Sequence, residues 1–368
     1  MSHEKNTLLV FPLLLCLTLF VILRETGIAQ IGTCLAACSV RRLLPAIGCM
    51  LLFVLCEAAN LKRCLQLSAP HPESSLLCGS GNAGAETAAK GETETEQETV
   101  SFRKQAIPYA LAGFFFSGIT PFSSGGQPMQ LYAMHRDGIS TARGTVSLAM
   151  ELASFQAASV TLAGAGLLYF HTFILERSGL AASLLLLGFA ANLALLSLLL
   201  LAIFLPDGIL RIIGAIAALM QKLRFAKAAQ FRAAADNWAA DYQGCAACLR
   251  GTPQKAVLLF ATSLLQLAAM HSIPYWVALS LGVRSVTFLQ VTALQAVLFL
   301  VVSLIPLPGG TGASEGGFLL LYTSVFTGGA LETAMLLSRF ASFYLPLLVS
   351  GLLLWVKSAG SPLHRIKE

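Results

Sequence analysis

Six apolar segments of about the length needed to cross a lipid bilayer constrain this chain more than any other feature. They are residues 8–23, 43–59, 145–170, 180–205, 256–281 and 330–356. A spanning helix needs about 20 apolar residues, and a chain with this many such runs cannot bury them all in a soluble globule. Only 11% of the residues are charged, against roughly 25% in soluble domains. The sequence therefore predicts an all-α polytopic membrane protein with about six full spans.

Two further apolar regions, 105–136 and 286–327, are broken by proline and glycine in the middle. The prolines at the breaks are Pro121, Pro306 and Pro308. Proline lacks an amide donor and glycine permits positive φ, so neither break can stay helical. Residues 105–119 as a helix would cover about 22 Å of a hydrocarbon core of about 30 Å. Each region is therefore predicted to form a re-entrant hairpin that reaches the middle of the membrane.

The positions of lysine and arginine predict the topology, because these residues concentrate on the cytoplasmic side. Lys62, Arg63, Arg103 and Lys104 flank the segment 66–100, which is therefore placed inside. Both termini then lie in the cytoplasm of a cell with the chain in its inner or plasma membrane. Hairpin 105–136 enters and leaves on the cytoplasmic face, whereas 286–327 does so on the outer face. The formal net charge of +6 is explained by such loops, without nucleic-acid binding.

A weak internal repeat supports this pairing of the two hairpins. At an offset of 188 residues, identical residues align at Leu131 and Leu319, at Thr145 and Thr333, at Leu148 and Leu336, and at 153–155 and 341–343. Broken helices at corresponding places in two inverted halves indicate a transport site. We expect an inverted repeat in which each half is a hairpin and its following helix.

The chain divides into spans and polar segments. We expect two N-terminal helices (1–65), a disordered acidic linker (66–100), the first hairpin with two helices (101–206), a basic amphipathic cytoplasmic segment (207–255), a helix with the second hairpin and the last helix (256–358), and a basic tail (359–368). The apolar run 8–23 is interpreted as a retained helix because no clean cleavage site of a signal peptide follows it.

Three ionisable side chains inside apolar segments are the leading site candidates: Glu151, Glu315 and Arg339. A charge near the bilayer centre costs at least roughly 2.5–3.5 kcal/mol, so such groups pair or line a cavity. The repeat aligns Glu151 with Arg339 and Gln127 with Glu315. An arginine suits a lipid phosphate, which it binds bidentately. The alternative is a structural Glu–Arg pair that bridges the two repeats.

Amide groups at the hairpin tips are the other candidates, because a helix N-terminus with free amides favours anions. The predicted substrate-binding residues are Gly125, Gly126, Gln127, Glu151, Gly309, Gly310, Thr311, Gly312, Glu315 and Arg339. The alternative for each break is a turn at the membrane surface that serves packing alone. Secondary candidates are His135, Arg136, Asp137, Gln266, His271, Gln290 and Gln295, which solvation or hydrogen bonding between helices would explain equally well.

The segment from Pro308 to Gly317, Pro-Gly-Gly-Thr-Gly-Ala-Ser-Glu-Gly-Gly, resembles the signature of the flippase-like transmembrane family, which includes the membrane region of lysylphosphatidylglycerol synthases. The break 121–126 with Glu151, and the segment 60–63, resemble its other motifs. The resemblance implies movement of an anionic or aminoacylated phospholipid, or another lipid-linked head group, between leaflets. Full-length synthases add a cytosolic domain that transfers lysine from tRNA. We expect the membrane part alone here.

The leading prediction is therefore a flippase that binds a membrane phospholipid. One alternative is a membrane subunit of a lysylphosphatidylglycerol synthase or glycolipid-assembly enzyme, with catalysis in a separate cytosolic acyltransferase or glycosyltransferase. Another is a transporter of small ions or solutes. The sequence contains no HExxH or Walker A motif, so we expect no catalytic residues, no cofactor, no metal and no direct contact with nucleic acid.

Overall fold

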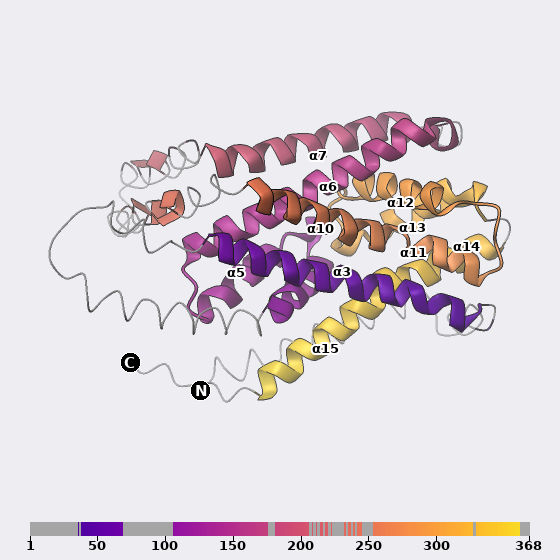
Figure 1. Cartoon of the computed structure of the whole chain (residues 1–368), viewed down its shortest axis with the longest axis horizontal. Coiled ribbons are helices and arrows are strands. Elements are labelled where there is room, and N and C mark those ends of the chain that lie inside the picture. Colours follow the sequence, from indigo (N-terminus) through magenta and orange to yellow (C-terminus); the bar gives the residue numbers. More distant parts are fainter. Residues whose placement is uncertain are drawn as a thin grey trace.

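The computed structural model describes residues 36, 38–68, 106–175, 181–205, 253–326 and 329–360, with isolated positions between 208 and 244. Every regular element in these residues is helical. Most of the helices run along the long axis of the molecule (Figure 1). The predicted linker 66–100 and tail 359–368 lie almost entirely outside the described residues, as do the run 8–23 and most of 207–255.

Five described helices are long and apolar enough to cross a membrane. They are Arg41–Leu67, Thr141–Thr172, Ser183–Phe204, Gln254–Ser280 and Gly329–Lys357. The first lies in α3 (Val40–Leu67), whose 28 residues extend about 42 Å at 1.5 Å per residue. These five coincide with five of the six predicted spans, and the all-α class is confirmed. The chain is a membrane protein.

The central helix of the bundle is α6 (Thr141–Leu175). It packs against α3, α5 (Gly126–Arg136), α7 (Ala181–Phe204), α10 (Pro253–His271) and α12 (Phe288–Val302). Close approach needs small residues. At Gly188 of α7 an added Cβ would lie 3.3 Å from the carbonyl oxygen of Leu300, and at Gly166 it would lie 3.0 Å from the Cβ of Ala293. The two glycines therefore let the backbones of α6 and α7 pack closely against α12.

The outer helix α7 lies along one edge of the molecule (Figure 1), against α6 and α12. Its other surfaces expose large apolar side chains, such as Leu186, Leu198 and Leu201. In water such a surface would drive aggregation, whereas in a bilayer it contacts lipid tails of similar polarity. The exposure is what a helix at the edge of a membrane bundle requires.

Both predicted interruptions are observed as helix–break–helix units. The first consists of the helix Ala106–Ile119, the short turn η2 (Pro121–Ser123) and α5. The second consists of α12, the turn η3 (Pro308–Gly310) and α13 (Ala313–Leu321). The arms of each unit contact one another, through Gly113 and Gln130 in the first and through α12 and α13 in the second. The three predicted break prolines all lie outside the α-helices.

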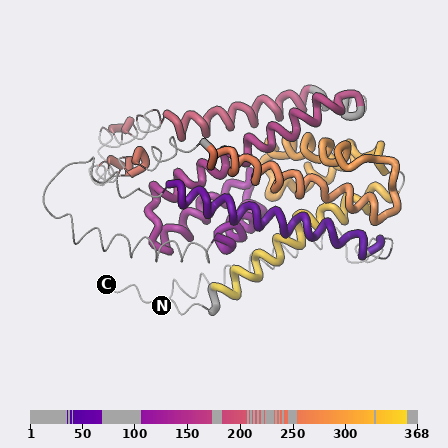
Figure 2. Tube along the Cα trace, in the orientation of Figure 1, coloured from indigo at the N-terminus to yellow at the C-terminus, as the bar shows by residue number. Residues whose placement is uncertain are grey.

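The two halves of the chain share one order of elements. Each has a broken unit followed by a long helix, α6 in the first half and α14 (Gly329–Arg339) with its continuation in the second. Thr141 and Gly329, the first residues of α6 and α14, differ by the same offset of 188 residues that aligns the sequence. Figure 2 shows the first unit (magenta) towards one end of the molecule and the second (orange to yellow) towards the other. The units approach the centre from opposite ends, and η2 contacts η3 there.

Two helices of the second half change geometry along their length. Helix α10 gives way to α11 (Ile273–Ser280) at Ser272, two residues before Pro274. Helix α14 continues through a π-helical segment, η5 (Phe340–Tyr344), into α15 (Leu345–Gly360). A π segment widens the turn to i→i+5 hydrogen bonds and occurs frequently at functional sites. Here it begins directly after Arg339.

Candidate functional site

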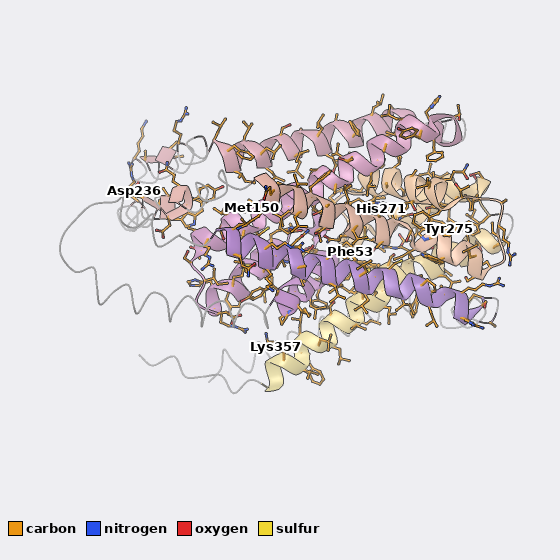
Figure 3. The ribbon with its side chains drawn as sticks, in the orientation of Figure 1. Phe53, Met150, Asp236, His271, Tyr275 and Lys357 are labelled. Atoms are coloured by element: carbon orange, nitrogen blue, oxygen red, sulfur yellow. The ribbon has the colours of Figure 1, made fainter. Side chains whose placement is uncertain are left out.

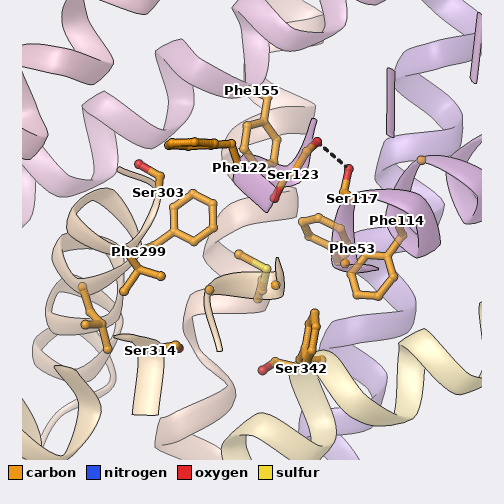
Figure 4. Close-up of a pocket in the computed structure, with 18 of the residues that line it drawn as sticks. Phe53, Phe114, Ser117, Phe122, Ser123, Phe155, Phe299, Ser303, Ser314 and Ser342 are labelled. Atoms are coloured by element: carbon orange, nitrogen blue, oxygen red, sulfur yellow. Dashed lines mark hydrogen bonds between the residues drawn. The ribbon is translucent and has the colours of Figure 1, made fainter. Parts of the chain in front are cut away.

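A cavity of about 510 Å³ lies where the two breaks meet. Residues from both broken units line it, together with residues from α3, α6, α7, α10, α11, α14 and η5. Its wall combines phenylalanines with hydroxyl groups, including Phe122, Phe155, Phe299, Ser303 and Ser314 (Figure 4). Ligand pockets typically hold about 300–1,000 Å³ and are mainly apolar with a few placed polar groups. The cavity matches that description.

The second break is held by an ion pair between Glu315 and Arg339. Arg339 Nε donates to Glu315 Oε1 at 2.5 Å, and Arg339 Nη2 donates to the carbonyl oxygen of Gly309 at 3.1 Å. Glu315 Oε2 accepts the amide of Gly312 at 2.6 Å, which caps the N-terminus of α13. Both side chains are largely buried, with 12% and 17% exposed. One carboxylate thus joins the arginine to the start of α13.

The guanidinium of Arg339 also lies against aromatic rings. Its Cζ is 4.4 Å from the ring centroid of Phe343 and 5.6 Å from that of Tyr344. Residues i+4 and i+5 both reach it because the π segment widens the turn after Arg339. Arg339 lines the cavity, whereas Glu315 does not. Because Arg339 pairs with Glu315, the ion pair lies within the second half. The alternative of a pair between Arg339 and Glu151 across the repeats is wrong.

The first break is held by hydroxyl groups instead of charges. Thr120 Oγ1 accepts the amide of Gly125 at 2.8 Å and donates to the carbonyl oxygen of Phe116 at 2.6 Å. Ser117 Oγ donates to the carbonyl oxygen of Ser123 at 3.3 Å (Figure 4). Phe122 and Ser123 both have φ of 54°, which is uncommon for residues with a Cβ. These hydrogen bonds hold a turn that its own residues disfavour.

The predicted tip residues divide into two groups. Gln127, Gly309 and Gly310 line the cavity along with Glu151 and Arg339. The remaining predicted residues Gly125, Gly126, Thr311, Gly312 and Glu315 do not. Four of the predicted amides already have protein acceptors: those of Gly125, Gly310, Thr311 and Gly312. In this conformation the polar groups that face the cavity are therefore mostly side chains.

Glu151 shares the cavity wall with another carboxyl group, Glu57 of α3, which sequence analysis did not select. Gln266 Nε2 of α10 donates to Glu57 Oε2 at 2.7 Å. Gln130 of α5, whose Nε2 donates to the carbonyl oxygen of Tyr109 at 3.2 Å, lines the same wall. Both glutamates line the cavity. Glu57 lies inside the predicted span 43–59, so the criterion that selected Glu151 would have found it.

A second polar group that the sequence analysis missed joins α6, α7 and the end of α12. Gln156 Nε2 donates to Asn192 Oδ1, and Asn192 Nδ2 donates to the carbonyl oxygen of Leu300 and to Ser303 Oγ, each at 3.2 Å. Gln156 and Asn192 are buried, and both line the cavity. This group fixes the C-terminal end of α12, where the second break begins.

The glutamines among the secondary candidates have structural partners. Gln290 forms a capping box with Thr287 at the start of α12, and Gln295 accepts from the hydroxyl of Tyr322 at 2.9 Å. Asp137 accepts from the hydroxyl of Tyr109 at 2.8 Å, beside Arg136 and His135 at the end of α5. His271 is fully buried in the middle of the bundle (Figure 3). Among the described residues neither of its ring nitrogens has a partner.

Comparison with known proteins gives a family. Residues 7–350 match the family described as "Lysylphosphatidylglycerol synthase TM region", so the match covers nearly the whole chain. No curated protein matches the chain. In the described part of the chain no group of three His, Cys, Asp or Glu side chains could hold a metal ion.

Proposed function

The chain belongs to the family of the lysylphosphatidylglycerol synthase TM region, and from this premise we propose that it moves lipid head groups between leaflets through the central cavity. The substrate class is an anionic or aminoacylated phospholipid or a related lipid-linked head group. We place the protein in the inner or plasma membrane with both termini in the cytoplasm.

The observation that carries the proposal is the meeting of the two breaks. Two broken units come from opposite ends of the molecule and touch at η2 and η3, with a cavity of about 510 Å³ at the contact. Re-entrant hairpins in such an arrangement would place the cavity near the midplane of the membrane, where transport sites lie. Non-helical backbone at that depth is tolerated only where protein or a wet cavity satisfies it.

Arg339 is the residue best suited to a phosphate group in this cavity. Two of its five N–H groups have partners among the described residues, at Glu315 and Gly309. The remaining donors leave capacity for phosphate oxygens, which the planar guanidinium binds with directional hydrogen bonds. Lining hydroxyls such as those of Ser303, Ser314 and Ser342 can supplement it.

Glu315 sets the strength of this phosphate site. Its carboxylate already forms an ion pair with Arg339. An incoming phosphate therefore competes with this carboxylate for the guanidinium. The competition prevents the phosphate from binding so tightly that it cannot leave. A carrier needs binding strong enough for entry and weak enough for release, as a channel does.

The test is head-group crossing in liposomes that contain the full chain. Labelled phosphatidylglycerol, its lysyl form and zwitterionic phosphatidylcholine would be compared for wild type, Arg339→Gln and Arg284→Gln. Arg284 is exposed and serves as the matched control. A charged hydrogen bond contributes roughly 1.5–3 kcal/mol, so we expect Arg339→Gln to slow crossing of anionic lipid by about tenfold or more, with Arg284→Gln unchanged. Folded wild type that accelerates no lipid would refute the proposal.

A further inference from the structure

The cavity wall contains a carboxyl pair that the phosphate site does not use. Glu57 on α3 and Glu151 on α6, two helices that pack against each other, both face the cavity. Glu151 is only 4% exposed. Two ionised carboxylates in one poorly hydrated wall would repel each other strongly, and a proton on one of them removes this repulsion. The contact between α3 and α6 is therefore suited to hold a proton.

The hydrogen bonds around the pair indicate which carboxyl holds this proton. Glu57 accepts from the amide of Gln266 at 2.7 Å. This amide donor stabilises the ionised form of Glu57, which assigns the proton of the pair to Glu151.

The side chain of Gln266 is a second, independent observation that points to a proton or water at the Glu57–Glu151 pair. Its side chain is fully buried, and its Oε1 has no partner among the described residues although its Nε2 holds Glu57. An unpaired buried acceptor costs roughly 1–3 kcal/mol. A carboxylic O–H or a water that carries a proton would satisfy this atom in another protonation state of the site.

Among the described residues, no arginine, lysine or histidine nitrogen forms an ion pair with either glutamate. Arg63 of α3 bonds Asn60 and Thr262, and Arg143 of α6 donates to the carbonyl oxygen of Leu65. The other titratable or charged side chains on the packed elements are Arg41, Arg42, Cys49, Cys56, Lys62 and Cys64 of α3, Tyr109 of the helix Ala106–Ile119, Tyr132, His135 and Arg136 of α5, Tyr169 and His171 of α6, Lys255 and His271 of α10, Tyr275 of α11 and Tyr344 of η5. Arg339 of α14 lines the same cavity.

We propose that Glu57 and Glu151 form a proton-binding site, and that its protonation is coupled to head-group movement through the cavity. This inference rests on the proposed function. Loss of the proton to the cavity leaves two carboxylates that repel each other, which favours separation of α3 from α6. Uptake of a proton restores the contact. One proton is bound and one released in each cycle, so a proton gradient across the membrane can bias the direction of movement.

The first test detects the proton directly. Infrared spectra of the purified full chain, in a detergent without ester groups, would be compared for wild type, Glu57→Gln, Glu151→Gln and Glu332→Gln. Glu332 is exposed on α14 and controls for loss of a carboxyl group. We expect a carbonyl stretch of a protonated carboxylic acid near neutral pH, shifted in D₂O, that is lost in Glu151→Gln, changed in frequency in Glu57→Gln and unchanged in Glu332→Gln. Absence of this band from folded wild type would overturn the site.

The second test measures coupling. Liposomes with a pH-sensitive dye inside would report proton movement while labelled phosphatidylglycerol crosses, with and without an imposed pH gradient. We expect lipid-dependent proton movement and gradient-dependent crossing in wild type, both lost in Glu151→Gln. Crossing that ignores the gradient and moves no protons would overturn the coupling and leave the proposed function standing. If folded wild type moves no lipid, the coupling and the proposed function fail together, and the infrared band alone reports the proton site.

Discussion

The two halves of this chain share an order of helices but stabilise their buried carboxyl groups differently. In the second half Glu315 is neutralised by Arg339, an ion pair that also caps α13. In the first half Glu151 shares the cavity wall with Glu57, and no arginine among the described residues forms an ion pair with either. An arginine keeps its charge at every physiological pH, whereas a carboxyl proton can exchange. The same architecture therefore holds one permanent charge pair and, in our proposal, one exchangeable proton.

The two breaks also differ in the residues that form their turns. The second break places glycines at its positive-φ positions, Gly309, Gly310 and Gly312, where they fit without strain. The first break places Phe122 and Ser123 there, and hydroxyl groups of Thr120 and Ser117 hold the turn. A turn specified by glycine keeps its shape through its own backbone, whereas the first turn depends on its surroundings.

The largest effect on stability should come from Arg339→Ala. It leaves Glu315 charged and largely buried without its partner, which costs roughly 3–5 kcal/mol for a buried pair. Thermal unfolding in detergent would show the loss as a lower Tm. The double variant Arg339→Ala with Glu315→Ala should regain part of it, because no lone carboxylate remains. A double variant less stable than Arg339→Ala alone would show that Glu315 acts mainly as the cap of α13.

A smaller effect is expected at the glycines of the second break. Gly309→Ala places a methyl group against the ring of Phe343 at a φ of 59°, so we expect destabilisation of roughly 2–3 kcal/mol. Gly312→Ala has a φ of 82° and a ψ of −50° but open space around its Cβ, so backbone strain alone should cost roughly 1–2 kcal/mol. The comparison separates steric from conformational cost in one turn. Equal Tm values for the two variants would contradict it.

The smallest effect on stability should come from Glu57→Gln. A glutamine preserves the shape of the side chain and keeps an oxygen that can accept from Gln266 Nε2, so we expect a change of under about 1 kcal/mol. The equivalent change Glu315→Gln removes one partner of an ion pair and should cost more. Similar Tm losses for both variants would show that the charge of Glu57 contributes as much to stability as the charge of Glu315 does.

The helices and breaks were predictable because they depend on local residue patterns. Runs of apolar residues predict the five described spans, and Pro121, Pro306 and Pro308 with their glycines predict where the helices stop. Contacts between distant segments were not predictable in this way. The partner of Arg339 is Glu315, which also caps α13 at Gly312, whereas the gapless repeat alignment offered a pair with Glu151 as the alternative. Glu57 lies within a predicted span, and only the packing of α6 against α3 brings Glu151 to the same cavity.

The outer position of α7 has a consequence for the kind of cargo that the cavity can accept. Asn192 and Leu195 of α7 face the cavity, while other sides of the same helix are exposed, so along this helix the wall is one helix thick. A molecule with long hydrocarbon tails could leave them among the bilayer chains and insert its polar end alone. The work of crossing would then be that of dehydrating a head group, independent of tail length. Sorting among cargoes would follow head-group chemistry and ignore the fatty acids attached.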